Sequence, residues 1–80
     1  MTVDEIIAQR EHTHGRYEDT ARIAQATKRL WHNEAGWANL NDKQAESLDC
    51  CATKIARILS GDAGAIEHWE DLEGYSRTAQ

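Results

Sequence analysis

The sequence predicts an all-α fold, and three features of its composition lead to this. Alanine, isoleucine and leucine supply twelve, six and five of the 80 residues, whereas valine occurs once and phenylalanine is absent. Such an alanine-rich, β-poor composition favours helices. The chain has no proline and five glycines, too few breakers for many short strands. The length predicts a single domain, residues 1–80.

A cap and an apolar period predict the first two helices. Thr2 is followed three residues later by Glu5, as in a capping box, which predicts a short helix ending near Gly15. From about Tyr17 to about His32, apolar positions recur every three to four residues, the period of an amphipathic helix. We therefore expect a short N-terminal helix followed by a longer one.

A loop and the most regular helix of the chain are predicted next. The loop, at residues 33–40, has no sustained apolar period, and we expect Trp37 and Leu40 to cover the open end of the core. Asn41 fits an N-cap with Gln44 three residues on, and the apolar residues after it fall on one helix face. Gly61 suits a left-handed position just past the end of this helix.

The fourth predicted helix follows a very short linker. It begins at about residue 63 or 65, with Ile66, Trp69, Leu72 and Ala79 facing inward. Two helices joined by so few residues pack as an antiparallel hairpin. The expected architecture is a helical bundle of three longer helices plus a short N-terminal one, with this hairpin at the C-terminus.

Charge and apolar content limit the classes of partner. Fourteen acidic residues against nine Lys and Arg give a net charge of −5, which repels nucleic-acid backbones. The apolar runs are short and the N-terminal segment carries early acids, so we expect no membrane span and no signal peptide. The adjacent Cys50 and Cys51 cannot close a disulfide of ordinary geometry. These features predict a cytoplasmic protein.

The short length also predicts self-association. A chain of this size buries only roughly 60% of the surface that its unfolded form exposes, so its core is thin. A partner subunit would add to that buried surface. We therefore expect a homo-oligomer, whose size the sequence does not fix.

The predicted hairpin brings opposite charges together. With the turn near residues 62 and 63, residues level with each other have numbers that add up to roughly 125. Lys54 is then level with Asp71, and Arg57 lies within a turn of Glu67. These pairs are either salt bridges at the rim of the hairpin or, beside Tyr75, the lining of a pocket for an anionic or metal-bound ligand.

Two further features have both a functional and a structural interpretation. His14 belongs to a polar segment, HTHGRY, that precedes a helix N-terminus, where free backbone N–H groups favour anions; the segment also fits a simple polar turn. Gly74, inside a helix, costs about 1 kcal/mol relative to alanine and usually marks the close approach of another backbone or a ligand.

Metal-binding patterns are weak in this sequence. Glu46 and Asp49, and Glu67 and Glu70, have attractive spacing, but within one hairpin the two pairs are offset by about 9 Å along the axis. They cannot share one ion there, although two subunits could bring them together. The His and Cys residues lack the spacing of a zinc site.

Three strings of the sequence resemble a group of small phage and prophage proteins of unknown function. They are HGRY at residues 14–17, KIARIL at 54–59 and HWEDLEGY at 68–75. That group is similar to the all-α nucleoside triphosphate pyrophosphatase superfamily, with its MazG-like and dimeric dUTPase-like members. The resemblance implies an intertwined helical oligomer, and in true enzymes a Mg²⁺ site made by an E-x-x-E pair on one helix and an E-x-x-D pair on the next.

The sequence departs from this pattern at the first acidic pair. Residues 54–57 read KIAR, so cations stand at this place, whereas the next helix keeps the acids Glu67, Glu70 and Asp71. A Lys or Arg beside these carboxylates supplies the charge that Mg²⁺ would otherwise supply. The departure argues against metal-dependent hydrolysis and leaves nucleotide binding open.

The resemblance and the hairpin together predict a nucleotide-interacting protein, either weakly catalytic or catalytically silent. Cations would contact phosphate, carboxylates would orient them or hold Mg²⁺, and Tyr75 or Trp69 would flank the base. The alternative is a non-enzymatic, acidic helical module that binds a host or phage protein through its Trp-bearing surface. The expected ligand-binding residues are Lys54, Arg57, Glu67, Asp71, Tyr75 and His14, with Glu67 and Asp71 as the ligands if Mg²⁺ binds.

Overall fold

The computed structural model describes all 80 residues and contains four α-helices, one short 3₁₀-helix and no strand. The all-α prediction is therefore confirmed. The N-terminal helix, with 12 residues, is only one residue shorter than the last helix, with 13. The helices are α1 (Val3–His14), α2 (Tyr17–His32), η1 (Ala35–Asn39), α3 (Asp42–Ser60) and α4 (Ile66–Thr78).

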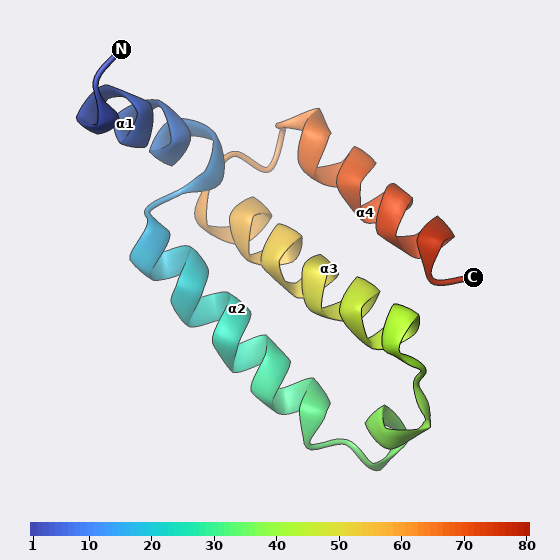
Figure 1. The fold of residues 1–80 in the computed structure, drawn as a ribbon. Coiled ribbons are helices and arrows are strands. Elements are labelled where there is room, and N and C mark those ends of the chain that lie inside the picture. The colour runs from blue at the N-terminus through green and yellow to red at the C-terminus, as the bar shows by residue number, and fades with distance from the viewer.

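The three helices α2, α3 and α4 form a single layer. Figure 1 shows α3 in the middle, with α2 and α4 on opposite sides of it, and α1 near the end of the layer where α3 meets α4. α3 packs along both neighbours, whereas α2 and α4 scarcely touch each other. α3 and α4 form the predicted antiparallel hairpin, and the molecule is 44 Å long.

Local capping explains where α1 and α3 begin. The Thr2 side chain accepts a hydrogen bond from the Glu5 N–H at 3.1 Å. Asn41 accepts from the Gln44 N–H at 2.8 Å, and the Gln44 side chain accepts from the Asn41 N–H at 3.1 Å, which completes a capping box. These contacts satisfy backbone donors that the first turn of a helix leaves free.

The core is thin and rich in alanine. Eight of the 80 residues are buried, and the apolar ones are Ala24, Ala52, Ala56 and Ile58. Small side chains allow α2 and α3 to approach closely, but they contribute little apolar area per residue. No helix is both long enough and apolar enough to cross a bilayer.

The inward face of α4 differs from the predicted one. Ile66 is 67% exposed and Trp69 is 53% exposed, whereas His68 between them is only 1% exposed. The covered positions, His68, Leu72 and Ala79, follow the spacing of a single helix face. The prediction was wrong at Ile66 and Trp69 because His68, which is bonded to the Thr13 carbonyl of α1, occupies the inward face of the helix.

The predicted roles of two glycines are also corrected. Gly61 has φ −117°, so it is not left-handed; the residue with a positive φ, +80°, is Gly15. Gly61 instead lies against the backbone of Thr13 and His14. At Gly74 an added Cβ would meet no atom within 4 Å, so nothing in the chain approaches it closely.

Candidate anion-binding groove

The end of α1 is bonded to the turn between α3 and α4. The Thr13 carbonyl, one of the last in α1, accepts the Asp62 N–H at 2.9 Å. It lies 3.3 Å from Nε2 of His68, which donates its N–H to this carbonyl because a carbonyl oxygen can only accept. A helix end leaves such carbonyls without partners in the helix, so the turn and α4 satisfy one of them.

The next carbonyl, that of His14, lies among hydroxyl groups from two other helices. Oγ1 of Thr20 on α2 lies 3.0 Å from it and Oγ of Ser60 on α3 lies 3.1 Å from it. The two hydroxyls are 2.8 Å apart. We call the residues Thr13–Gly15, Thr20, Ser60–Asp62 and His68 the α1 junction. The junction fixes α1 against both α2 and α3.

Two glycines allow the backbones to meet at this junction. A Cβ on Gly15 would overlap the Ser60 backbone, and a Cβ on Gly61 would overlap the backbone from Thr13 to Gly15. Gly15 also adopts φ +80° and ψ 177°, which residues with a side chain rarely adopt. Both positions therefore require glycine for reasons of space.

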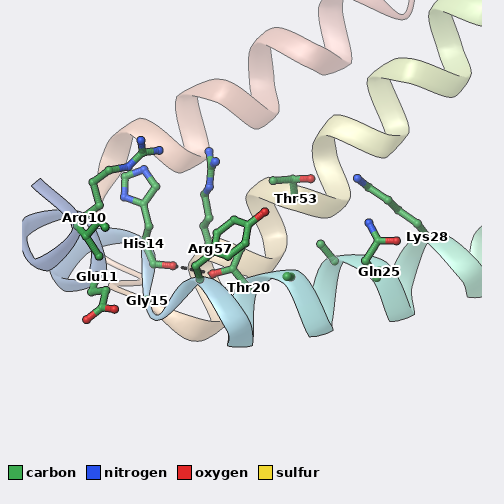
Figure 2. A pocket seen from close by; sticks show the side chains of 13 residues that line it. Arg10, Glu11, His14, Gly15, Thr20, Gln25, Lys28, Thr53 and Arg57 are labelled. Carbon is green, nitrogen blue, oxygen red and sulfur yellow. Dashed lines mark hydrogen bonds between the residues drawn. The ribbon is translucent and has the colours of Figure 1, made fainter. Parts of the chain in front are cut away.

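A groove of about 500 Å³ opens between α1, α2 and α3 beside the junction. Figure 2 shows its polar side chains in two groups. At the junction end lie Arg10, His14 and Arg57, and farther along α2 and α3 lie Gln25, Lys28 and Thr53.

Three of the cations that line the groove have no carboxylate partner. Arg10, Lys28 and Arg57 form no ion pair within 4.0 Å, although Glu11 also lines the groove. Of the six cations outside the groove, four are paired with acids, whereas Arg29 and Lys43 form no ion pair. The groove therefore carries positive charge in a protein of net charge −5. The paired cations are Arg16, Arg22, Lys54 and Arg77.

His14 is held in its neutral form at this end of the groove. Burial lowers the pKa of His14 below its ordinary value of 6.5, and the nearby charges of Arg57, His68, Arg10 and Lys54 lower it further. A neutral imidazole is both a donor and an acceptor of hydrogen bonds. At neutral pH the positive charge at this end therefore comes from the two arginines.

We expect acid to destabilise the fold through His14. Because folding lowers its pKa, the unfolded chain binds more protons, and the contribution of His14 is fully present above pH 6.5 and is lost as pH falls through the folded pKa. Urea unfolding at about pH 7.5 and about pH 5 measures this loss, which His14→Gln should reduce. His12→Gln, an exposed neighbour, is the control and should leave the pH dependence unchanged.

The predicted pair of Lys54 and Asp71 is present. Nζ of Lys54 lies 2.8 Å from Oδ2 of Asp71, and Ser47 and Thr78, whose numbers also add up to 125, lie 3.4 Å apart. The hydrogen bond from Lys54 is the main cause that lowers the pKa of Asp71 below 3.8. The register predicted for the hairpin therefore agrees with these contacts.

The predicted pair of Arg57 and Glu67 is absent. No ion pair joins them, because Arg57 lies in the groove beside α1 while Glu67 is an exposed residue of α4. The residue level with Arg57 across the hairpin is His68, which the junction buries. Arg57 is thereby left free to meet a ligand.

Removing the charge of Asp71 should have a small effect on stability. Asp71→Asn is expected to lower the free energy of unfolding by about 1 kcal/mol or less, because the carboxylate is 45% exposed. Chemical denaturation at neutral pH measures it. Glu73→Gln, which removes an exposed pair with Arg77 on the same helix, should cost less still. A loss of several kcal/mol for Asp71→Asn would mean a structural network instead of a rim salt bridge.

The two aromatic candidates lie outside the groove. Tyr75 is beside Cys50 on the hairpin, where the neighbouring thiol and burial raise the pKa of its hydroxyl. The indole N–H of Trp69 donates to the Ala63 carbonyl at 2.8 Å, on the turn before α4. Of the expected binding residues, the structure places His14 and Arg57 in the groove, Lys54 and Asp71 in a salt bridge, and Glu67 and Tyr75 elsewhere on α4.

The residues present do not fit the Mg²⁺ site that the resemblance implies. No three His, Cys, Asp or Glu side chains lie close enough together to hold a metal ion. Asp71 is already bonded to Lys54, and no third ligand joins it and Glu67 in one cluster. Mg²⁺ takes several oxygen ligands in near-octahedral geometry, which these two acids do not supply.

The sequence analysis missed Arg10 and Lys28 as groove residues. A signal was present, because Arg10 and His14 are four residues apart on α1, and Thr20, Ala24 and Lys28 follow at the same spacing on α2. That these two faces meet depends on the α1 junction, which no local pattern predicts.

Comparisons with known proteins gave no relative. No family model matches the chain, and neither the curated proteins nor the solved structures include a match. The phage and pyrophosphatase-like affiliation therefore stays a prediction from the three strings of sequence.

Proposed function

We propose that this protein binds a nucleotide, or a related small molecule that carries phosphate, in the groove between α1, α2 and α3. The observation that supports this is the set of three unpaired cations, Arg10, Lys28 and Arg57, in one groove of an acidic protein. Arginine and lysine bind phosphate through charge-assisted hydrogen bonds. A volume of about 500 Å³ is in the range of small-molecule sites.

The two ends of the groove suit different parts of such a ligand. At the junction end, Arg10 and Arg57 offer donors for phosphate oxygens. The neutral His14 lies at the same end of the groove. Farther along, Gln25 and Thr53 offer neutral polar groups that suit a base or a sugar, and Lys28 in the same group is the third cation of the groove. The rise along α2 from Thr20, at the junction, to Lys28 is about 12 Å, which is enough for an extended nucleotide.

The proposal keeps the affiliation predicted from the sequence. Under it the protein is phage-derived, cytoplasmic, self-associating and pyrophosphatase-like, and it is either weakly catalytic or catalytically silent. Of the motif at residues 54–57, Arg57 faces the groove, whereas Lys54 is bonded to Asp71 on the hairpin. The phosphate-binding role thus belongs to Arg57 together with Arg10.

A second candidate function is an acidic helical module that binds another protein. The half-exposed Trp69 and the exposed Leu59 favour it, because large apolar side chains left on a surface mark interaction sites. This second candidate predicts that no nucleotide binds, since a protein-binding module of this kind does not need one.

Calorimetric titration with nucleoside mono-, di- and triphosphates, with and without Mg²⁺, separates the two. We expect binding that Arg57→Gln and Arg10→Gln each weaken about tenfold, the loss of one charged hydrogen bond. Arg22→Gln changes the net charge equally but removes an exposed pair with Asp19 on α2, and it should bind like the parent. A parallel assay for released pyrophosphate measures catalysis.

Two results would contradict the proposal. Silence of the whole nucleotide panel would exclude nucleotide binding and favour the protein-binding module. Equal weakening by Arg22→Gln and Arg57→Gln would mean general electrostatic attraction in place of a groove with specific contacts.

A further inference from the structure

One face of the α2–α3–α4 layer has no second layer on it. α3 meets α2 through Ser60, which contacts Thr20, and it meets α4 through Lys54, which contacts Asp71. Side chains at other angles around α3 face neither helix. Helical domains are stable when a second layer covers the apolar face of the first, so an uncovered apolar face requires an explanation.

An apolar stripe of α3 occupies this uncovered position. Leu48, Ile55 and Leu59 follow one another at helical spacing, and Leu48 and Leu59 are 39% and 68% exposed. At 100° per residue, Ile55 points roughly opposite to Thr53 and Arg57, which line the groove. The stripe and the groove are therefore on opposite faces of the layer.

The neighbouring helices extend the stripe into a broad surface. On α2, Ile23 and Leu30 lie on the side away from the groove, and Leu30 is 64% exposed. On α4, Leu72 is half-buried on the side away from Asp71. We call the set the open face. The open face consists of Ile23, Leu30, Leu48, Ile55, Leu59 and Leu72.

An apolar hollow continues the open face toward η1. It has a volume of about 310 Å³ and is lined by Trp31, Trp37 and Leu40 together with Leu48 of the open face, and also by Glu34 and Gly36. Trp37 and Leu40 are themselves only half-buried, so they do not close this end of the layer alone. The hollow would receive side chains from whatever covers the open face.

The charge pattern favours a second copy of the same chain as the cover. The stripe of α3 contains no charged residue. Its fourth member is Cys51, which lies between Leu48 and Ile55. Two copies, each of net charge −5, can therefore meet there without placing like charges opposite one another. Along this uncharged stripe of α3 the chain can pair with itself, whereas Asp19, four residues before Ile23, and Glu34 in the hollow lie near the edge of the open face.

The exposed area agrees with one missing interface. The chain exposes 5637 Å², whereas a folded monomer of 9.0 kDa is expected to expose about 4,850 Å². The excess, roughly 800 Å², is what one partner buries in an interface of standard size. α1, which has no buried residue, contributes to the excess as well.

We propose that the open face pairs with the same face of a second copy about a two-fold axis, which gives a dimer in which two three-helix layers pack face to face. The two grooves then lie on the outer surfaces of the dimer, one in each subunit. The inference assigns a surface to the self-association expected from the short chain. It stands apart from the proposed ligand binding, because neither the groove nor its cations take part in the pairing.

Sedimentation analysis and light scattering of the full chain test the dimer. We expect a mass of about 18 kDa, twice that of the 9.0 kDa chain. Leu59→Glu and Leu30→Glu should each raise the dissociation constant at least tenfold, because the charge is buried twice in a two-fold interface. Val3→Glu is the matched control, since Val3 is an equally exposed aliphatic residue on α1, and it should leave the dimer intact.

Circular dichroism identifies any variant that does not fold. If one of Leu59→Glu and Leu30→Glu does not fold, the other tests the dimer interface. A parent protein that stays monomeric at high micromolar concentration would overturn the proposal and leave another protein as the cover. A dimer that survives both Leu59→Glu and Leu30→Glu, or one that Val3→Glu dissociates, would also overturn it. Nucleotide titration is unaffected by either outcome, so the two proposals fail separately.

Discussion

Gly15→Ala is expected to lower the free energy of unfolding by about 3 kcal/mol. Two costs combine at this position. Alanine rarely adopts φ +80° with ψ 177°, and its Cβ would overlap the backbone of Ser60. The backbones of Gly15 and Ser60 must move apart, which weakens the hydrogen bonds to the His14 carbonyl. Urea unfolding followed by circular dichroism measures the loss.

Gly74→Ala is the matched control for this change. Gly74 lies inside α4, and an added Cβ would meet no atom within 4 Å. Alanine there should raise the free energy of unfolding by about 0.5–1 kcal/mol, because glycine loses more backbone freedom on forming a helix. If both variants changed stability in the same direction, the close approach at Gly15 would have no energetic role.

His68→Ala is expected to cost about 3 kcal/mol as well. His68 is the largest fully buried side chain of the molecule, packs edge-on against the His14 ring with centroids 4.8 Å apart, and donates to the Thr13 carbonyl. Alanine would leave a cavity at the α1 junction and remove one donor from that carbonyl. Thermal or chemical unfolding of the variant gives the value.

Two companion variants show whether packing or hydrogen bonding carries this effect. Glu67→Ala, at the exposed neighbouring position, should change stability by no more than about 0.5 kcal/mol. His68→Leu refills much of the space but cannot donate to Thr13, so it should cost less than His68→Ala. The importance assigned to His68 would be refuted by equal values for His68→Ala and Glu67→Ala.

The helix ends and the hairpin were predictable because their causes are local. Thr2 and Asn41 cap the next few residues of the chain, and Gly15 follows the last turn of the first helix. The short turn after α3 leaves one register for α4, which is why Lys54 and Asp71 could be matched from their numbers alone.

The groove could not be predicted because its walls are distant in the sequence. Arg10 on α1 and Arg57 on α3 meet only because two backbones touch at Gly15 and Gly61. Glycine at both positions was visible, but either one alone fits an ordinary helix end. The same reasoning explains why Arg57 was assigned to Glu67, since the hairpin considered alone gives Arg57 no other partner.

The position of α1 also has a consequence for local opening of the fold. α1 has no buried residue and is held mainly by the contacts of the α1 junction. A segment with so little buried surface opens locally at a lower free energy than the rest of a fold. When α1 opens, Arg10 leaves with it and the groove is lost. A ligand held between Arg10 and Arg57 binds only the closed molecule, so it would keep α1 in place.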